Sequence, residues 1–223
     1  MTGTDSAAGT EPDTDQGGSV KSGADSEEPE TDVAGPETDS VEPEPDPEAE
    51  ARRQYALSQV RQYPDSVLRM RARDVEDFEQ AAGLAERMTL VMTEARGVGL
   101  AAPQVGVLQR ILVYQADPEI EPAALFNPAV VAFSEETQTT EEGCLSLARA
   151  TVNGPVERSL SVSVSARDAS GEPVELELEG LEARIIQHEI DHLDGVLIID
   201  RTTPEERRAA MAELRPKPTL GRG

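Results

Sequence analysis

The first fifty residues are too acidic and too poor in apolar side chains to belong to a folded core. They contain sixteen Asp or Glu residues against one basic residue, Lys21, which is −15 of the net charge of −24. They also hold six prolines and no aromatic residue. Such a segment cannot bury enough apolar surface to offset the entropy lost on ordering it. We therefore predict a disordered tail over 1–50, one folded domain over 51–215 and a flexible C-terminal tail over 216–223.

Charge and hydropathy also restrict where the protein works. The acidic excess argues against direct DNA binding, because no basic patch balances it. No apolar run approaches the roughly 18 residues that a membrane helix needs, and residues 1–10 lack the pattern of a secretory signal. A single cysteine cannot form an internal disulfide, which fits a reducing compartment. We expect a cytoplasmic protein with no membrane contact, and we interpret the tail as a solubilising extension in preference to a docking segment.

The spacing of apolar residues predicts an α+β domain. Residues 51–73 look like a segment that wraps the domain, and Asp74 is the expected N-cap of the helix that follows. Helices are predicted over 75–94, 181–194 and 204–214, and strands over 109–115, 128–133, 159–166 and 173–179. The last two strands alternate with period two and should form a hairpin. This order favours mainly antiparallel β-sheets packed around the central helix 181–194.

A possible metal site lies on that central helix. His188 and His192 are four residues apart, so both imidazoles lie on one helical face and can reach one metal ion. Glu189 adds a carboxylate beside the first ligand, which suits it to acid/base chemistry. The alternative is a chance pair of histidines on an exposed helix. Both histidines of the chain fall in this HExxH motif, which favours the metal site.

A catalytic metal centre needs a third protein ligand. The metzincin pattern is excluded because position 198 is Ile198 where a histidine would be needed. The downstream glutamates available to a thermolysin-like site fall in a polar terminal helix. A lone cysteine is more often a small buried hydrophobe than a ligand. However, Cys144 lies in a polar EGCLS turn, 142–146, and is the remaining soft ligand. A Cys/His/His set is a known catalytic zinc or iron arrangement.

A glycine-rich segment, GVGLAAPQ at 97–104, is the third notable motif. Its first six residues match the dinucleotide pattern GxGxxA, but a helix precedes them instead of a strand, and Pro103 interrupts the helix that should follow. As a loop, the segment offers free backbone groups near a ligand. It also offers one uncharged amide, Gln104, suited to polarising a carbonyl group.

Together, the segments GVGLAAPQ (97–104), EGCLS (142–146) and QHEIDHL (187–193) resemble the signature of the peptide deformylase family, in the same order. The resemblance extends over about 67–203. It implies a metal-dependent hydrolase that removes the N-formyl group from the initiator methionine of newly made polypeptides and releases formate. It implies N-formylmethionyl peptides as partners. We further expect a transient contact with the ribosome and a monomeric chain.

The resemblance also implies a role for individual residues. Cys144, His188 and His192 would bind Fe²⁺, for which Zn²⁺, Ni²⁺ or Co²⁺ can substitute. Glu189 would take a proton from the attacking water and return it to the leaving amine.

The remaining implied roles concern the substrate. The side chain of Gln104 and the backbone N–H of Leu145 would stabilise the oxyanion, and Gly99 would pair with the peptide backbone. An apolar pocket for methionine would be lined by Val98, Leu181 and Ile185.

The chain departs from the family pattern directly after the EGCLS turn. Ala148 stands where the family often has proline, and Arg149 is the residue nearest to the position of the usual arginine, so the segment 147–154 bears on substrate preference. Two alternatives stay open. One is a non-catalytic deformylase paralogue that binds peptides, and the other is a zinc peptidase of another fold, for which Cys144 would be dispensable.

Overall fold

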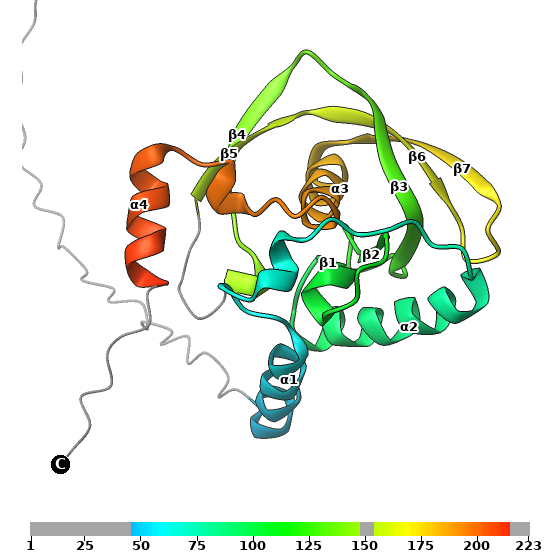
Figure 1. Ribbon diagram of the computed structural model, residues 1–223, viewed down its shortest axis with the longest axis horizontal. Coiled ribbons are helices and arrows are strands. Elements are labelled where there is room, and N and C mark those ends of the chain that lie inside the picture. The colour runs from blue at the N-terminus through cyan, green and yellow to red at the C-terminus, as the bar shows by residue number, and fades with distance from the viewer. Residues whose placement is uncertain (1–45, 148–153, 215–223) are drawn as a thin grey trace, which may run out of the picture. The chain divides into compact units, whose positions relative to one another are not determined.

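The computed structural model describes residues 46–147 and 154–214 (Figure 1). Most of the tail predicted over 1–50 lies outside this part, as do 148–153, within the atypical segment, and the C-terminal tail 216–223. Helix α1 (Pro47–Gln59) begins before the predicted boundary at residue 50. The Asp46 carboxylate caps this helix by accepting from the Glu48 N–H at 3.0 Å, and proline occupies the first turn.

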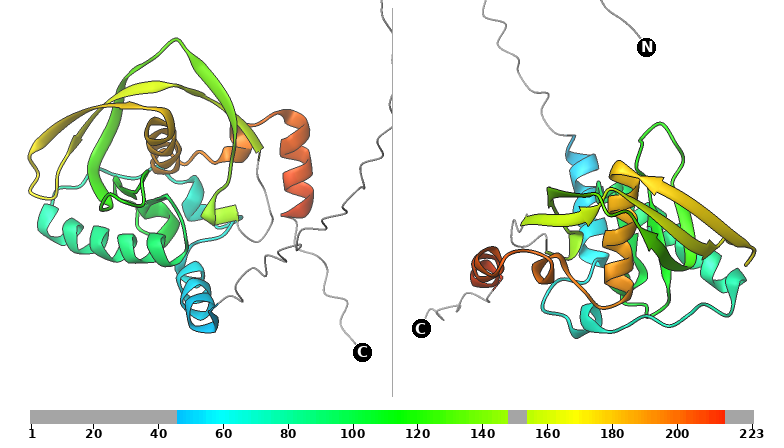
Figure 2. Two further views of the ribbon diagram at one scale, coloured as in Figure 1. Left: turned by 180° about the vertical axis from the view of Figure 1, so that it is seen from behind. Right: turned by 90° about the horizontal axis from the view of Figure 1, so that it is seen from above.

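Two antiparallel sheets form the framework. The larger has the strand order β1 (Gly99–Ala101), β2 (Ile111–Tyr114), β3 (Ala123–Phe133), β6 (Ser161–Arg167) and β7 (Pro173–Glu179). The smaller pairs β4 (Thr137–Glu142) with β5 (Gly154–Ser159). The long strands curve over helix α3 (Gly180–Leu193), as the two views of Figure 2 show. This arrangement confirms the predicted α+β class with a central HExxH helix.

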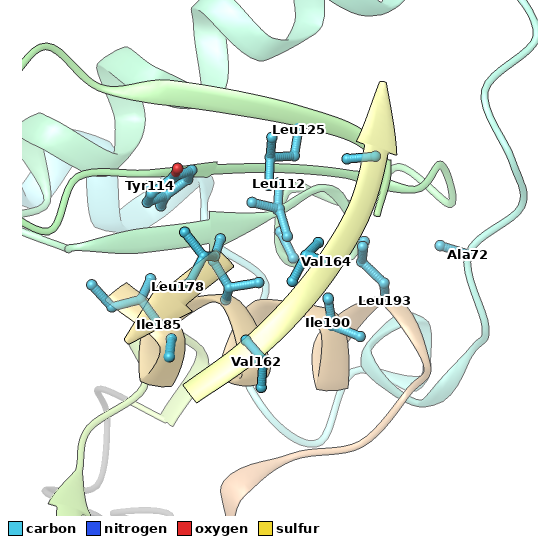
Figure 3. Packing of buried hydrophobic residues seen from close by; sticks show 14 residues of the cluster. Ala72, Leu112, Tyr114, Leu125, Val162, Val164, Leu178, Ile185, Ile190 and Leu193 are labelled. Carbon is cyan, nitrogen blue, oxygen red and sulfur yellow. The ribbon is translucent and has the colours of Figure 1, made fainter. Parts of the chain in front are cut away.

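The larger sheet is buried on both faces near β2. Ile111 and Val113 pack with helix α2 (Phe78–Glu94), whereas Leu112 and Tyr114 face the side of α3. Successive strand residues point to opposite faces, so a strand covered on both sides is a continuous apolar run. Figure 3 shows Leu112 among the residues that pack with α3.

The start of α2 corrects one prediction. Asp77, not Asp74, is the N-cap, and its carboxylate accepts from the Gln80 N–H at 3.0 Å. The segment before Asp77 is not helical, because the Val75 N–H donates to the Asn127 side chain at 2.7 Å. The tertiary contact with Asn127 keeps residue 75 out of the helix.

Other predicted elements are confirmed, and some were not predicted. The β6–β7 hairpin forms around Asp168, whose carboxylate accepts from the N–H groups of Ser170 and Glu172. Helix α3 ends before Gly195, as expected from the left-handed φ of 77° at that glycine. Helix α1 and strands β1, β4 and β5 were not predicted.

Besides the apolar residues on the two faces of the larger sheet, the C-terminal part of the chain contributes to a separate apolar cluster. Helix α4 (Pro204–Glu213) begins after Thr203, as predicted, and packs Ala210 with Leu197 and Ile199. Within the described ranges, no helix is both long enough and apolar enough to cross a membrane.

Candidate metal centre

Three potential ligands converge at α3. His188 and His192 lie one turn apart, with ring centroids 5.0 Å from each other. The Sγ atom of Cys144 lies 3.2 Å from Nε2 of His192. One ligand atom from each of the three residues lies within 4.8 Å of the others. The structure therefore brings together the three residues predicted to bind a metal.

Cys144 reaches α3 because the preceding strand and the following turn are both anchored. It follows β4, whose last residue, Glu142, pairs with Gly154 of β5. The turn η3 (Leu145–Leu147) is held from the N-terminal side by the Gln62 side chain, which donates to the Leu145 carbonyl at 2.8 Å. The predicted wrapping segment thus positions the cysteine turn.

The donor set fits a divalent metal. Nδ1 of His188 pairs with the Glu142 carboxylate at 2.9 Å, which leaves Nε2 of the same ring for a metal. Burial lowers the pKa of His192 well below its usual value, so this imidazole is neutral, as a ligand must be. One thiolate and two imidazoles are three of the four ligands of a tetrahedral site, which leaves one position for chemistry.

Glu189 is a buried carboxyl group facing this centre. It is 3% exposed, and within the described residues its Oε2 has no hydrogen-bond partner. Burial raises the pKa of Glu189 to about 7, although His188 and Arg158 act in the opposite direction. A carboxyl group with a pKa near neutrality can both accept and donate a proton.

Gln104 is held rigidly beside the cysteine. Its Oε1 accepts from the Ala101 N–H at 2.8 Å, which turns the amide NH₂ toward Ser146 Oγ at 3.2 Å and Cys144 Sγ at 3.8 Å. The GVGLAAPQ segment contains strand β1 and leads into the turn η2 (Ala102–Val105). It is therefore not the loop between a strand and an α-helix that a dinucleotide-binding site requires.

A cavity of about 400 Å³ opens onto the centre. Val98 and Leu181 are half exposed at it, whereas Ile185 is 4% exposed. The cavity is lined by nearly all the predicted site residues: Val98, Gly99, Gln104, Cys144, Leu145, Leu181, Ile185, His188 and Glu189. His192 does not line it and is 1% exposed.

The sequence reasoning missed the role of Glu142 and its partners. This carboxylate is buried and contacts His188, Arg158 and Arg184. Burial alone would raise the pKa of Glu142, but hydrogen bonds with His188 and Arg158 lower it to about 2. The position of Glu142 in the EGCLS motif indicated that this residue matters, but a motif alone does not predict which side chains Glu142 contacts.

The α+β fold and this site are those expected of a metal-dependent hydrolase. The sequence pattern of the family described as polypeptide deformylase matches residues 57–208. The peptide deformylase of Thermotoga neapolitana is 49% identical over 152 residues, which cover 68% of this chain and 90% of the relative. That of Desulforudis audaxviator is 44% identical over 154 residues, which cover 69% and 98%.

Solved structures agree with the sequence relatives. The peptide deformylase of Thermotoga maritima has a TM-score of 0.62 and 46% identity, covering 65% of this chain and 97% of the other. Peptide deformylase 1B of Arabidopsis thaliana, in complex with an inhibitor, has a TM-score of 0.66 and 36% identity, covering 70% and 87%. The chain belongs to the polypeptide deformylase family.

Proposed function

We propose that this chain removes the N-formyl group from the initiator methionine of newly made polypeptides, with Cys144, His188 and His192 as its metal ligands. The observation that carries the proposal is the convergence of these three ligands beside the buried Glu189. The reaction adds water across the formyl C–N bond. It yields formate and a free amine.

A divalent metal in the ligand set would lower the pKa of a water molecule toward neutrality and polarise the formyl oxygen. We propose Fe²⁺ as the bound ion, with Zn²⁺, Ni²⁺ or Co²⁺ able to replace it. Thiolate ligation supplies more negative charge than a third imidazole would. This moderates the acidity of the ion and increases the need for a protein base.

Glu189 is that base in the proposal. Among the described residues its Oε2 has no hydrogen-bond partner, and this atom and a pKa of about 7 suit Glu189 to take the proton of the attacking water. The same carboxyl group then gives the proton to the departing nitrogen when the C–N bond breaks. One residue thereby holds the proton throughout the reaction.

Gln104 and Leu145 supply the oxyanion donors. The Ala101 N–H fixes the Gln104 amide with its NH₂ group on the side of Cys144, and we assign this group as one donor to the charge that develops on the formyl oxygen. Leu145 begins the turn η3 and lines the same cavity, and we assign its backbone N–H as the second donor.

Strand β1 offers an edge for the peptide. It is the terminal strand of the larger sheet and pairs only with β2 there, so an extended peptide can add alongside Gly99. Val98, Leu181 and Ile185 then provide apolar surface for the methionine side chain. We further propose that the protein works as a cytoplasmic monomer that contacts the ribosome transiently.

The deciding experiment measures formate release from formyl-Met-Ala-Ser by the Fe²⁺-loaded protein under anaerobic conditions. We expect turnover by the unmodified chain. Glu189→Ala should retain the metal, since Glu189 is not a ligand, and lose most of the turnover.

Two other results would contradict the proposal and favour one of the alternatives. Metal-loaded protein that binds the formylated peptide without releasing formate would be a non-catalytic paralogue. Cleavage of internal peptide bonds without formate release would identify a peptidase.

A further inference from the structure

We propose that Glu142 and Arg158 are positioning residues that hold the cysteine and histidine segments of the metal centre in register. The inference rests on the proposed metal site and assigns it two supporting residues. Neither side chain is among the ligands.

Glu142 contacts one of the proposed ligands directly. Nδ1 of His188 lies 2.9 Å from Oε2 of Glu142. A carboxylate can only accept here, so the Nδ1 atom of His188 carries a proton. A metal ligand must be a neutral imidazole, and with Nδ1 protonated that neutral ring has its lone pair at Nε2. Such an outer-shell carboxylate fixes both the tautomer and the ring orientation of a metal-binding histidine.

Arg158 connects the two segments that carry the ligands. Glu142 lies two residues before Cys144, and Asp191 directly precedes His192. Arg158 of β5 joins them: its Nε and Nη2 donate to the two Glu142 oxygens at 3.0 Å each, and its Nη1 donates to Asp191 Oδ2 at 2.6 Å. One guanidinium therefore bridges the cysteine segment and the histidine helix.

The bridge is buried and continues at both ends. Arg158 is 5% exposed and Glu142 is 6% exposed. Arg184 donates to Glu142 at 2.7 Å, and Arg201 donates to Asp191 Oδ1 at 2.5 Å. Because both carboxylates have cationic partners, their desolvation is compensated, and the planar guanidinium fixes their relative geometry.

A purely structural role for Glu142 makes a different prediction from a positioning role. As a counter-ion alone, Glu142 would need only its negative charge near Arg158 and Arg184. As a positioning residue, it must also reach His188. Glu142→Asp separates the two roles, because it keeps the charge and retracts the carboxylate by one methylene group.

The test measures Co²⁺ binding to metal-stripped full-length protein, by competition with a chelator and by the visible absorption bands of the bound ion. We expect Glu142→Asp to weaken Co²⁺ affinity by about 10- to 100-fold and to shift the bands. Arg158→Lys keeps the charge but loses the planar bidentate contact with Glu142, and it should weaken affinity in the same direction. Glu157→Asp, the same shortening at the exposed neighbour of Arg158, should change neither.

The outcomes separate the two proposals. If the unmodified chain fails to bind Co²⁺, the proposed metal site itself is wrong. If the chain binds Co²⁺ and both variants match its affinity and spectrum, the positioning role is wrong. Circular dichroism of the metal-free variants identifies any that do not fold, and the folded variant then decides. If neither variant folds, Glu142 and Arg158 are needed for the fold and the specific positioning role is rejected.

Discussion

Gly99 lies against the carboxyl group of Glu189, so closely that a Cβ atom at residue 99 would clash with Oε1. The same Cβ would lie 2.9 Å from Ile185 Cγ2. The backbone of β1 therefore approaches the central helix closely only because residue 99 has no side chain.

Gly99→Ala should displace Glu189. We expect kcat/KM for formyl-Met-Ala-Ser to fall by about 100-fold, because small misplacements of a reacting group have effects of that order. Metal content should be unchanged. The matched control is Gly83→Ala in α2, where the added Cβ meets only Arg87 Nη1 at 3.8 Å. That control should keep full activity, and equal activity of the two variants would contradict the steric argument.

Gln104→Glu should impair the chemical step. The carboxylate can still accept from the Ala101 N–H, but it has no N–H to donate to a developing oxyanion. We expect kcat to fall by about 10²- to 10³-fold, with metal affinity retained. Gln80→Glu on the exposed side of α2 makes the same charge change away from the site and should be neutral. Unimpaired turnover by Gln104→Glu would exclude this residue as an oxyanion donor.

Cys144→Ser should lose the metal. A hydroxyl group stays protonated at neutral pH and is a harder donor than thiolate, so it binds Fe²⁺ or Zn²⁺ poorly. Loss of an outer-shell partner lowers metal affinity by about 10- to 100-fold. We expect loss of the Cys144 ligand itself to lower it further. Metal analysis after dialysis measures this, and Glu189→Ala, which leaves all three ligands in place, is the contrast. Retention of both metal and activity would restore the zinc peptidase alternative.

Asp200→Asn should reduce stability in a pH-dependent way. Burial alone would raise the pKa of Asp200, but the hydrogen bonds from Arg69 and the Leu197 N–H lower it. A lowered folded-state pKa means that the stabilisation is present above the unfolded value of about 3.9 and is lost as pH falls below it.

Urea unfolding at several pH values measures this effect. At pH 7, we expect Asp200→Asn to lower the free energy of unfolding by about 1 kcal/mol, because the ion pairs are partly exposed. The difference should shrink as pH falls below about 4. Glu213→Gln, at an exposed acid in α4, is the control. A difference that is constant with pH would show that the charge of Asp200 is not responsible.

Much of the framework follows from local patterns in the sequence. Residues 161–167 and 173–179 alternate with period two, and both form strands with the expected hairpin. His188 and His192 share a face because a helix places residues four apart one above the other. Glu189 lies three residues before His192, a spacing that also places two side chains on one helical face. These features depend on neighbours in the chain, and local pattern therefore predicts them.

Tertiary structure decided the rest, because the determining contacts join residues distant in the chain. Strand β4 is exposed along nearly its whole length and carries no apolar alternation, yet pairing with β5 brings Cys144 to the histidines. The Glu142–Arg158–Asp191 bridge joins three separate elements. The sequence by itself determined which side chains could bind a metal. Only long-range strand pairing and buried ion pairing decided that they meet, and which carboxylate orients His188.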